Sequence, residues 1–360
     1  MKRKWTRCSR CALSAEFPRI EFDDEGVCSF CRNHVFYAID DDAIEKARKK
    51  IAKLFSDRRR DRNYDALVCL SGGKDSTYTL MLAVKKYGLK PLAFTLDNGF
   101  LSEQALDNIR CAVDRFDVDH IMIRPSIETM KPIFRVSALK KIYTPRTLTR
   151  ISAVCNTCIT MVNTLSVMLA LEKNISFVVA GFSLGQIPSN AIIYRPDYHL
   201  IQESRAQYVE AIEKSSGKSL KEYFLIRDEL LNLPSPWHIN LLCLESVTED
   251  QIMRELSSIG WKKPEDVDGC SSNCRLNTFN NYVHEMAYGY NPYELELSHL
   301  IKKGFLTREE ALKKLQDKAS SNLDVILKEL GISQSELKEA TDMLAGKATE
   351  LKRKKRDGRE

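Results

Sequence analysis

The chain has 360 residues, 43% of them hydrophobic, so it is long enough for one large core with a small satellite or for two modest domains. Its formal net charge is +6, from 55 basic and 49 acidic residues; this imbalance is mild, and the charge alone does not favour a nucleic-acid partner. The basic start MKRKWTRCSR is not followed by an apolar stretch of signal-peptide length, and we find no run approaching the roughly 20 residues of a membrane span. We therefore expect a cytoplasmic protein with no membrane partner.

Residues 1–36 carry two Cys-x-x-Cys pairs around a turn-rich segment that is too short to hold a hydrophobic core. The reducing cytoplasm disfavours disulfides, so metal binding is the better explanation of such pairs. The two pairs are separated by 16 residues, which is a spacing typical of a structural four-cysteine zinc site. Bound Zn2+ would supply the folding energy that this segment lacks. The expected ligands of this zinc ribbon are Cys8, Cys11, Cys28 and Cys31.

A linker helix is expected within residues 37–60, where Ile44, Ala47, Ile51 and Leu54 recur at helical spacing. From residue 61 to residue 274, short apolar runs alternate with helical patterns, which is typical of an open parallel α/β sheet. The expected strands are 65–70, 91–96, 119–124 and 176–180, and the expected helices are 75–87, 102–116, 126–139 and 158–173. The active site of such a sheet lies at the carboxyl ends of its strands.

The first expected strand runs into a glycine turn, and a helix is expected to begin at about Asp75. The turn reads Ser71-Gly72-Gly73-Lys74-Asp75-Ser76. Two glycines let the backbone approach a polyphosphate, and the start of the helix offers oriented N–H groups. Lys74 adds a positive charge, and Ser71 and Ser76 add hydroxyl donors. This pattern predicts a phosphate-binding loop, although its spacing is not that of a Walker loop.

Four prolines interrupt the pattern over residues 182–240, where we expect loops, a helix near 203–216 and the determinants of substrate specificity. The stretch LLCLESVTEDQIMRELSSIGW predicts a strand and then a helix that starts near Thr248. Residues 275–346 are expected to form a helical C-terminal region, followed by a solvated basic tail over 347–360. The helices expected in this region are 276–288, 293–303, 307–318, 321–330 and 334–346.

The seven remaining cysteines fall into two groups and three isolated residues. The isolated Cys69, Cys111 and Cys243 stand in apolar runs and are expected to be small buried hydrophobes. The other four are Cys155, Cys158, Cys270 and Cys274. Cys155 and Cys158 are expected near a helix start, which lowers a thiol pKa and favours the thiolate. Three hypotheses stay open: a 4Fe-4S cluster held by two cysteines of the first group and one of the second, a second zinc site that uses all four, and unrelated thiols.

The loop resembles the PP-loop of the ATP pyrophosphatase superfamily, whose motif S-G-G-x-D-S is matched at every specified position. The resemblance implies a sheet of the PP-loop/HUP type. It also implies transfer of AMP from ATP to an acceptor oxygen, release of pyrophosphate, and displacement of AMP by a nitrogen or sulfur nucleophile. Lys74 and Asp75 would then be catalytic, with Asp75 either orienting Mg2+ or capping the helix. Asp97 and Gly181 would contact the nucleotide, and for Asp97 a turn-forming role before Asn-Gly is the alternative.

Three further stretches resemble the N-acetyl sugar amidotransferases of surface-polysaccharide synthesis. They are CSRCALSAEFPRIEFDDEGVCSFC, FDVDHIMIRPSIETMKPIFR and YGYNPYELELSHLIKKGFLTREEALKKL. With the phosphate loop they span about residues 8–315 in order. In that family, ammonia from a glutaminase partner displaces AMP. Residues 140–200 match least, because they offer Cys155 and Cys158 and then AGFSLGQIPSN, which has no acidic residue.

We therefore favour an adenylating sulfurtransferase, in which Cys155 and Cys158 are also catalytic. Its acceptor would be a small carbonyl compound or tRNA, and a sulfur-donor protein is an expected partner. The alternative is a sugar amidotransferase with a glutaminase partner. A third hypothesis is a non-catalytic nucleotide-binding or zinc-ribbon interaction protein. We expect a homo-oligomer in each case.

Overall fold

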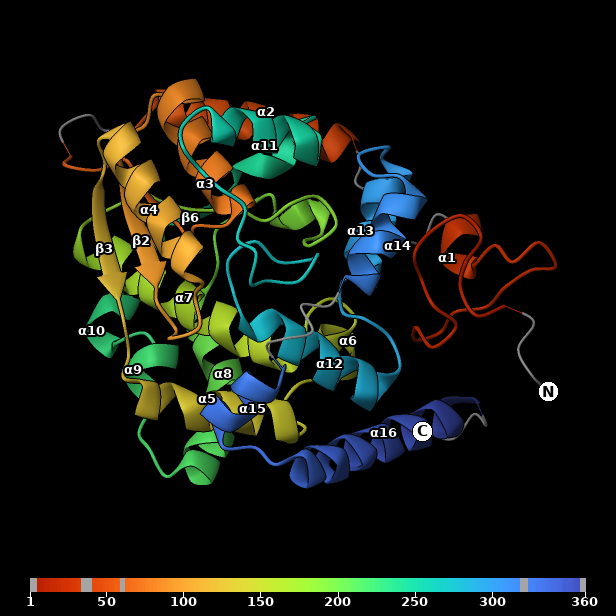
Figure 1. Cartoon of the computed structure of the whole chain (residues 1–360). Coiled ribbons are helices and arrows are strands. Elements are labelled where there is room, and N and C mark those ends of the chain that lie inside the picture. Colours follow the sequence, from red (N-terminus) through yellow and green to blue (C-terminus); the bar gives the residue numbers. More distant parts are fainter. Residues whose placement is uncertain (1–4, 34–40, 59–61, 318–322, 357–360) are drawn as a thin grey trace.

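The computed structural model describes residues 5–33, 41–58, 62–317 and 323–356, and at its centre is a six-stranded sheet (Figure 1). The strand order is β3-β2-β1-β4-β6-β5. Every neighbouring pair is parallel except β5 and β6, so the predicted α/β fold with a mostly parallel sheet is confirmed. The strands are β1 (Ala66–Cys69), β2 (Pro91–Leu96), β3 (Asp119–Ile123), β4 (Phe177–Ala180), β5 (Ile193–Tyr194) and β6 (Trp237–Asn240).

Helices cover both faces of the sheet, and successive residues of β1 alternate between two hydrophobic clusters. Ala66 and Val68 pack into one cluster and Leu67 into the other, because side chains alternate along a strand. The first cluster contains residues of α2 (Asp41–Ser56), α3 (Lys74–Met81), α4 (Glu103–Phe116) and α11 (Glu249–Ser257). The second contains residues of α5 (Ile127–Leu139), α7 (Ala153–Glu172), α8 (Tyr198–Ser216), α12 (Leu276–Tyr288), α15 (Leu323–Leu330) and α16 (Gln334–Arg356).

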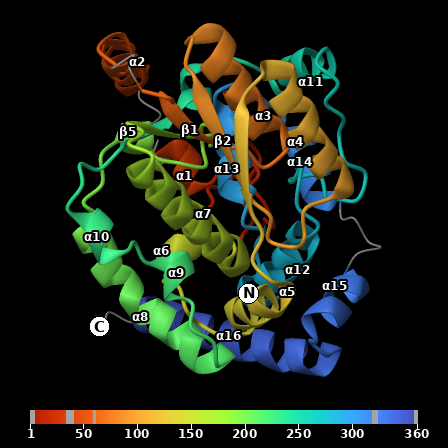
Figure 2. The same ribbon diagram turned by 90° about the vertical axis from the view of Figure 1, so that its left-hand side faces the viewer.

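The predicted helical C-terminal region is confirmed, and α13 (Glu294–Lys302) and α14 (Arg308–Gln316) stand between the sheet and the N-terminal ribbon (Figure 1). Figure 2 shows α8 and α16 running along the edge of the molecule below α7. The helix α16 extends ten residues beyond the predicted end at 346. Of the predicted basic tail, residues 357–360 and the side chains of 347–356 lie outside the described part, as do residues 1–4 and 34–36 of the ribbon.

The smaller helical elements connect this frame. They are α1 (Ser29–Arg32), α6 (Pro145–Leu148), α9 (Lys221–Phe224), α10 (Asp228–Leu231), the π-helical turn Leu82–Lys86 that continues α3, and the 3-10 turns Ser189–Ala191 and Leu241–Leu244.

Two parts of the sheet differ from the sequence-based prediction. The predicted strand in LLCLES is a 3-10 turn, Leu241–Leu244, and the strand β6 lies immediately before it. The apolar side chains of this turn are buried. Their hydrophobic pattern therefore correctly indicated burial, but it did not indicate an extended backbone. The strand β6 contains the polar residues His238 and Asn240, so it lacks the continuous apolar run by which a buried strand is predicted. The short β5 pairs only with β6 in the described sheet.

The helix α7 corrects the expectation that no apolar run is long enough to span a membrane. Its 20 residues, Ala153–Glu172, reach that length and apolarity. Half of its most apolar window is buried inside the protein, and the helix packs against β1, β2 and β4. The helix begins at Ala153, five residues earlier than predicted, because the Ser152 side chain caps it by accepting the N–H of Cys155. Cys155 and Cys158 therefore lie in its first two turns.

Candidate active site

The phosphate loop connects the end of β1 to the start of α3, and its glycines make close approaches that a larger residue would prevent. Gly72 has φ of +76°, and a Cβ there would lie 2.1 Å from the carbonyl oxygen of Ala105. Gly73 precedes Lys74 at the N-cap of α3, and a Cβ there would lie 2.9 Å from Ser272 Oγ. The loop conformation thus requires both glycines of the motif.

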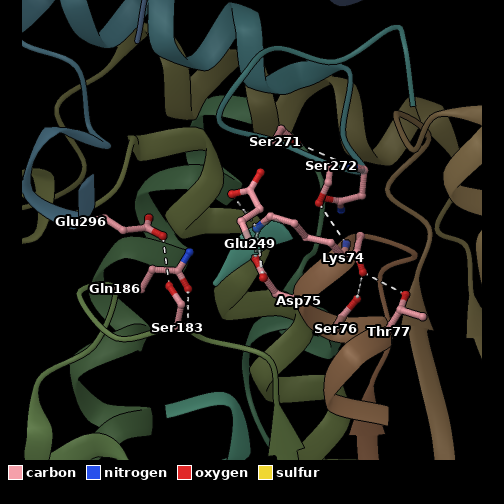
Figure 3. Close-up of polar contacts among 12 residues, drawn as sticks. Lys74, Asp75, Ser76, Thr77, Ser183, Gln186, Glu249, Ser271, Ser272 and Glu296 are labelled. Atoms are coloured by element: carbon pink, nitrogen blue, oxygen red, sulfur yellow. Dashed lines mark hydrogen bonds and ion pairs between the residues drawn. The ribbon is translucent and has the colours of Figure 1, made fainter. Parts of the chain in front are cut away.

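The hydroxyl groups of the motif hold the loop in shape (Figure 3). Ser71 Oγ lies 3.0 Å from Ser76 Oγ, and the backbone N–H of Ser71 donates to Ser76 Oγ over 3.1 Å. Ser76 Oγ and Thr77 Oγ1 both donate to the carbonyl oxygen of Gly73, over 3.1 and 2.9 Å. These bonds hold the turn against the first turn of α3.

Lys74 is surrounded by carboxylates. Its Nζ lies 2.8 Å from Asp75 Oδ2 and 3.8 Å from Oε2 of Glu249, the first residue of α11. Burial lowers the pKa of Lys74, but Asp75 and Glu249 outweigh burial and the net pKa is raised. Burial raises the pKa of Glu249, but Lys74 and Lys314 outweigh it and the net pKa is lowered. Lys74 therefore contributes a full positive charge to the phosphate loop at neutral pH.

Asp97 and Gly181, the two other predicted nucleotide contacts, lie at the carboxyl ends of β2 and β4. Asp97 is buried, its Oδ1 accepts the N–H of Gly99 over 2.9 Å, and its Oδ2 lies 3.2 Å from Arg124 Nε. These contacts are those expected of the turn-forming role of Asp97, which was the alternative to a nucleotide contact. A Cβ on Gly181 would lie 2.9 Å from Ser76 Cα, so this glycine lets the end of β4 pack against α3.

A cavity of about 560 Å³ extends from the phosphate loop to four of the cysteines. Its volume is within the usual range for a small-molecule site. The loop contributes Ser71, Gly73, Asp75 and Ser76 to the cavity wall. Cys155 and Cys158 come from α7, and Cys274 precedes α12. Cys69, which was expected to be an isolated hydrophobe, also lines this cavity.

Side-chain amides contact the cysteine sulfurs in the cavity. Asn98 Nδ2 lies 3.4 Å from Cys158 Sγ and 4.0 Å from Cys274 Sγ, and Asn280 Nδ2 lies 3.0 Å from Cys155 Sγ. Hydrogen bonds donated to a sulfur stabilise its negatively charged form. These amide contacts favour the thiolate, but they act against the burial of the same sulfurs.

The predicted lowering of the thiol pKa at the start of α7 is wrong. Burial raises the pKa of Cys155, and it raises that of Cys158 to about 11. Burial also raises the pKa of Cys274. Desolvation thus outweighs the helix N-terminus, and these thiols would need a bound cation to lose their protons.

Cys270 does not join the other three cysteines in this cavity. Its Sγ contacts the carbonyl oxygen of Lys314 at 3.7 Å, and it lines two neighbouring hollows. Within the described part of the chain, only the four N-terminal cysteines place three or more candidate ligand atoms within 4.8 Å of one another. The arrangement therefore disagrees with a single zinc site made from Cys155, Cys158, Cys270 and Cys274.

The N-terminal cysteines have the geometry of a metal site. Cys8 Sγ lies 3.9 Å from Cys31 Sγ, and Cys11 Sγ lies 3.7 Å from Cys28 Sγ. A tetrahedral site with zinc–sulfur bonds of about 2.3 Å separates its sulfurs by about 3.8 Å. Backbone N–H groups of Arg10, Cys28 and Cys31 also donate to these sulfurs. The four thiols thus fit one tetrahedral Zn2+.

The ribbon is docked on α13 and α14 through specific contacts. Glu294 Oε2 accepts the N–H of Ser14 over 2.8 Å, and Ser298 Oγ accepts the N–H of Ala12 over 3.1 Å. Arg308 of α14 donates to the carbonyl oxygen of Cys8 over 2.8 Å. The same helix α13 presents Glu296 to the cavity, so it links the ribbon to the candidate active site.

Glu296 is a site residue that sequence reasoning missed. Its Oε1 accepts the hydroxyl of Ser183 over 3.1 Å, and the N–H of Ser183 donates to Gln186 (Figure 3). The segment after β4 has no acidic residue, and α13 supplies one there. Gly185 makes this possible, because a Cβ on it would lie 3.0 Å from the carbonyl oxygen of Glu296. The only sequence signal that could have indicated Glu296 was the resemblance of residues 288–315, which contain it, to the N-acetyl sugar amidotransferases.

Replacement of Glu296 by glutamine is expected to flatten the pH dependence of stability. Burial and then the Asp75 carboxylate raise the pKa of Glu296 from 4.5 to about 7, against the opposing effects of Lys74, Ser183 and Gln186. As pH rises from 4.5 to 7, the unfolded chain loses this proton before the folded chain does, so Glu296 lowers stability over that window. Thermal denaturation at pH 5 and pH 8 measures the decline.

The exposed Glu309 provides the matched control, since its replacement by glutamine should keep the wild-type decline. An equal decline in the Glu296→Gln variant and the wild type would contradict the assignment.

The chain is similar to a family model and to one protein of another organism. A family model described as the C-terminal domain of WbpG-like LPS biosynthesis proteins matches residues 272–357. An uncharacterized protein of Methanocaldococcus jannaschii is 21% identical over 313 residues, which are 86% of this chain and 93% of that protein.

Two solved structures are among those to which the chain is similar. The U34-tRNA thiolase NcsA of Methanococcus maripaludis, with its 4Fe-4S cluster, has 16% identity over 74% of this chain and 79% of its own, with a TM-score of 0.35. The NMN synthetase of Francisella tularensis has 13% identity over 81% of this chain and 97% of its own, with a TM-score of 0.36.

The mostly parallel sheet, and the position of the S-G-G-x-D-S motif between β1 and α3, are those that the resemblance to the PP-loop ATP pyrophosphatase superfamily predicts. Its C-terminal region is, in addition, similar to the WbpG-like C-terminal domain. The last of the stretches that resemble sugar amidotransferases, residues 288–315, falls inside that match.

Proposed function

We propose that this protein is an ATP-dependent adenylating enzyme that activates an acceptor oxygen as an AMP adduct, releases pyrophosphate and then replaces the oxygen with sulfur. The observation that carries the proposal is the single cavity that joins the phosphate loop to Cys155, Cys158 and Cys274. An acceptor bound there would lie between the nucleotide and the cysteines.

In the adenylation step, the protein has to position the reactants and neutralise phosphate charge. The loop around Gly73 and the start of α3 provide close backbone approach and N–H donors. Lys74 would neutralise the developing charge on pyrophosphate, and Asp75 would orient the Mg2+ that accompanies ATP. Adenylation turns the acceptor oxygen into a good leaving group, because it departs as AMP.

In the replacement step, Cys155, Cys158 and Cys274 would hold a 4Fe-4S cluster through three of its irons. Two observations support this assignment: the three cysteines line the same cavity, and Asn98 and Asn280 donate to the sulfurs of Cys158 and Cys155. When bound, such a cluster supplies a site for sulfide at the fourth iron. Cys270, which lies outside the cavity, is left out of the ligand set.

Metal and sulfide analysis of protein purified without oxygen tests the proposal. The sulfurtransferase should be brown and contain iron and acid-labile sulfide besides zinc, and it should release pyrophosphate from ATP when a carbonyl acceptor or tRNA is supplied. Colourless protein with zinc alone would exclude the sulfur step.

Cys155→Ala is expected to remove most of the iron and to leave the zinc in place. The ribbon cysteines lie in a different part of the molecule and do not depend on α7. Cys111→Ala is the matched control, because Cys111 Sγ contacts the carbonyl oxygen of Ile259 and does not line the cavity. Equal iron contents in Cys155→Ala, Cys111→Ala and wild-type protein would make Cys155 and Cys158 ordinary thiols.

An ammonia-dependent N-acetyl sugar amidotransferase is the second candidate. The match of residues 272–357 to a WbpG-like domain of LPS biosynthesis supports it. Ammonia from a glutaminase partner would displace AMP from the sugar, and the same loop would perform adenylation. This enzyme would be colourless, and its pyrophosphate release in the presence of a sugar acceptor would rise with added ammonium.

A further inference from the structure

The segment between α11 and α12 crosses directly over the phosphate loop. Ser272 Oγ accepts the backbone N–H of Lys74 over 3.1 Å (Figure 3). The same oxygen lies 2.9 Å from where a Cβ of Gly73 would stand, and Asn273 Oδ1 lies 3.3 Å from it. Ser272 thus packs on the face of Gly73 that lacks a side chain.

The amide that Ser272 occupies is one that a nucleotide would use. Lys74 is the first residue of α3, so its N–H has no acceptor within the helix. Such N–H groups at a helix start are the usual donors to phosphate oxygens. One donor N–H directed at one acceptor cannot serve the serine hydroxyl and a phosphate oxygen equally well, so the two ligands compete.

The segment that carries Ser272 also carries Cys274. Asn273 accepts the N–H of Ser102 over 2.9 Å through its carbonyl oxygen, and Cys274 forms a β-bridge with Leu101. Upstream, the Asp268 carboxylate accepts the N–H groups of Cys270 and Ser271 over 2.9 and 3.0 Å. Ser272 therefore lies in a short stretch between two anchored points, so its displacement strains the contacts that hold Asn273 and Cys274.

We propose that Ser272 competes with a nucleotide phosphate for the Lys74 amide, so that ATP binding displaces residues 271–273 and shifts Cys274 in the cavity. This inference rests on the proposed function, because it assumes that ATP binds the loop. It adds a regulatory consequence: the sulfur-bearing wall of the cavity changes its arrangement only when the nucleotide is in place. Because coupling is reciprocal, loss of the Ser272 hydroxyl strengthens nucleotide binding.

The first test compares the affinity for ATP with Mg2+ by isothermal titration calorimetry. Ser272→Ala should bind ATP about fivefold more tightly than the wild type, the factor that corresponds to the net free energy of a typical hydrogen bond. Ser258→Ala is the matched control: Ser258 Oγ donates to the carbonyl oxygen of Glu255, and Ser258 does not line the cavity. Its affinity for ATP should stay close to that of the wild type.

The second test needs no variant. Hydrogen–deuterium exchange of the wild-type protein is measured with and without ATP and Mg2+. If Ser272 is displaced, the N–H groups of Asn273 and Cys274 lose their bonds to Ser271 Oγ, and the peptide that contains residues 269–276 exchanges faster. If Ser272 instead forms part of the nucleotide site, the same peptide exchanges more slowly.

The outcomes separate this inference from the proposed function. Tighter binding by Ser272→Ala together with faster exchange in 269–276 supports the competition. Unchanged or weaker binding by the variant, or slower exchange, overturns the competition. The proposed function is still supported in that case, provided that the wild type binds ATP. No ATP binding by the wild type overturns both.

Discussion

Lys74→Ala is expected to weaken ATP binding by about 10- to 100-fold, the range that corresponds to a hydrogen bond with a charged group. Pyrophosphate release should be lost with any acceptor. The Nζ of Lys74 lies beside Asp75 and Glu249, and the net increase in its pKa keeps it charged at neutral pH. Calorimetry with ATP and Mg2+ measures the binding, and a coupled pyrophosphate assay measures the release.

Lys314→Ala is the matched control for this experiment. Lys314 has nearly the same side-chain exposure, 22% against 20%, and also pairs with Glu249, at 2.8 Å. It lies on α14 and not in the phosphate loop, so its variant should keep ATP affinity. Equal affinities of the Lys74 variant and the wild type would remove the basis for the nucleotide site.

Cys11→Ser is expected to abolish zinc binding and to unfold the ribbon over residues 5–33. The buried apolar side chains of this segment form only one small cluster around the cysteines, so we expect bound metal to supply much of the folding free energy. Without the ribbon, Glu294 and Ser298 of α13 lose their backbone partners Ser14 and Ala12. Zinc analysis and limited proteolysis measure the two effects.

Cys111→Ser serves as the control, because this isolated thiol lies on α4 and has no other cysteine as a partner in the described structure. It should retain zinc and resist proteolysis as the wild type does. Retention of zinc by Cys11→Ser, or absence of zinc from the wild type, would show that the ribbon folds by another means.

Those parts of the fold that depend on local pattern were predictable. Four strands of the sheet were expected within a residue or two, and β1, β2 and β4 are the buried apolar runs typical of parallel strands, whereas β3 is a more exposed strand at the edge of the sheet. The helix α11 begins after Thr248 as predicted, since Thr248 and Gln251 form a capping box. The strand β6 was missed because its polar residues and the preceding prolines resemble a loop.

Parts of the candidate site that depend on distant contacts were not predictable. Burial in a medium of low dielectric raises the pKa of Cys155, and this effect is larger than the lowering expected at a helix start. Glu296 is separated from Ser183 by 113 residues, and no spacing rule connects them. The separation of Cys270 from Cys274 into different hollows likewise follows from how the segment before α12 crosses the loop.

The amino-acid sequence by itself indicated the alternation of strands and helices, the glycine turn of the phosphate loop and the paired cysteines of the ribbon, because each of these patterns is formed by residues that are close along the chain. Only the tertiary structure decided that Cys155, Cys158 and Cys274 share a cavity, that α13 brings Glu296 to the end of β4, and that Ser272 meets the amide of Lys74. The two residues of that last contact are 198 positions apart. Packing of the two helical layers against the sheet brings such residues together, and packing is a property of the whole chain.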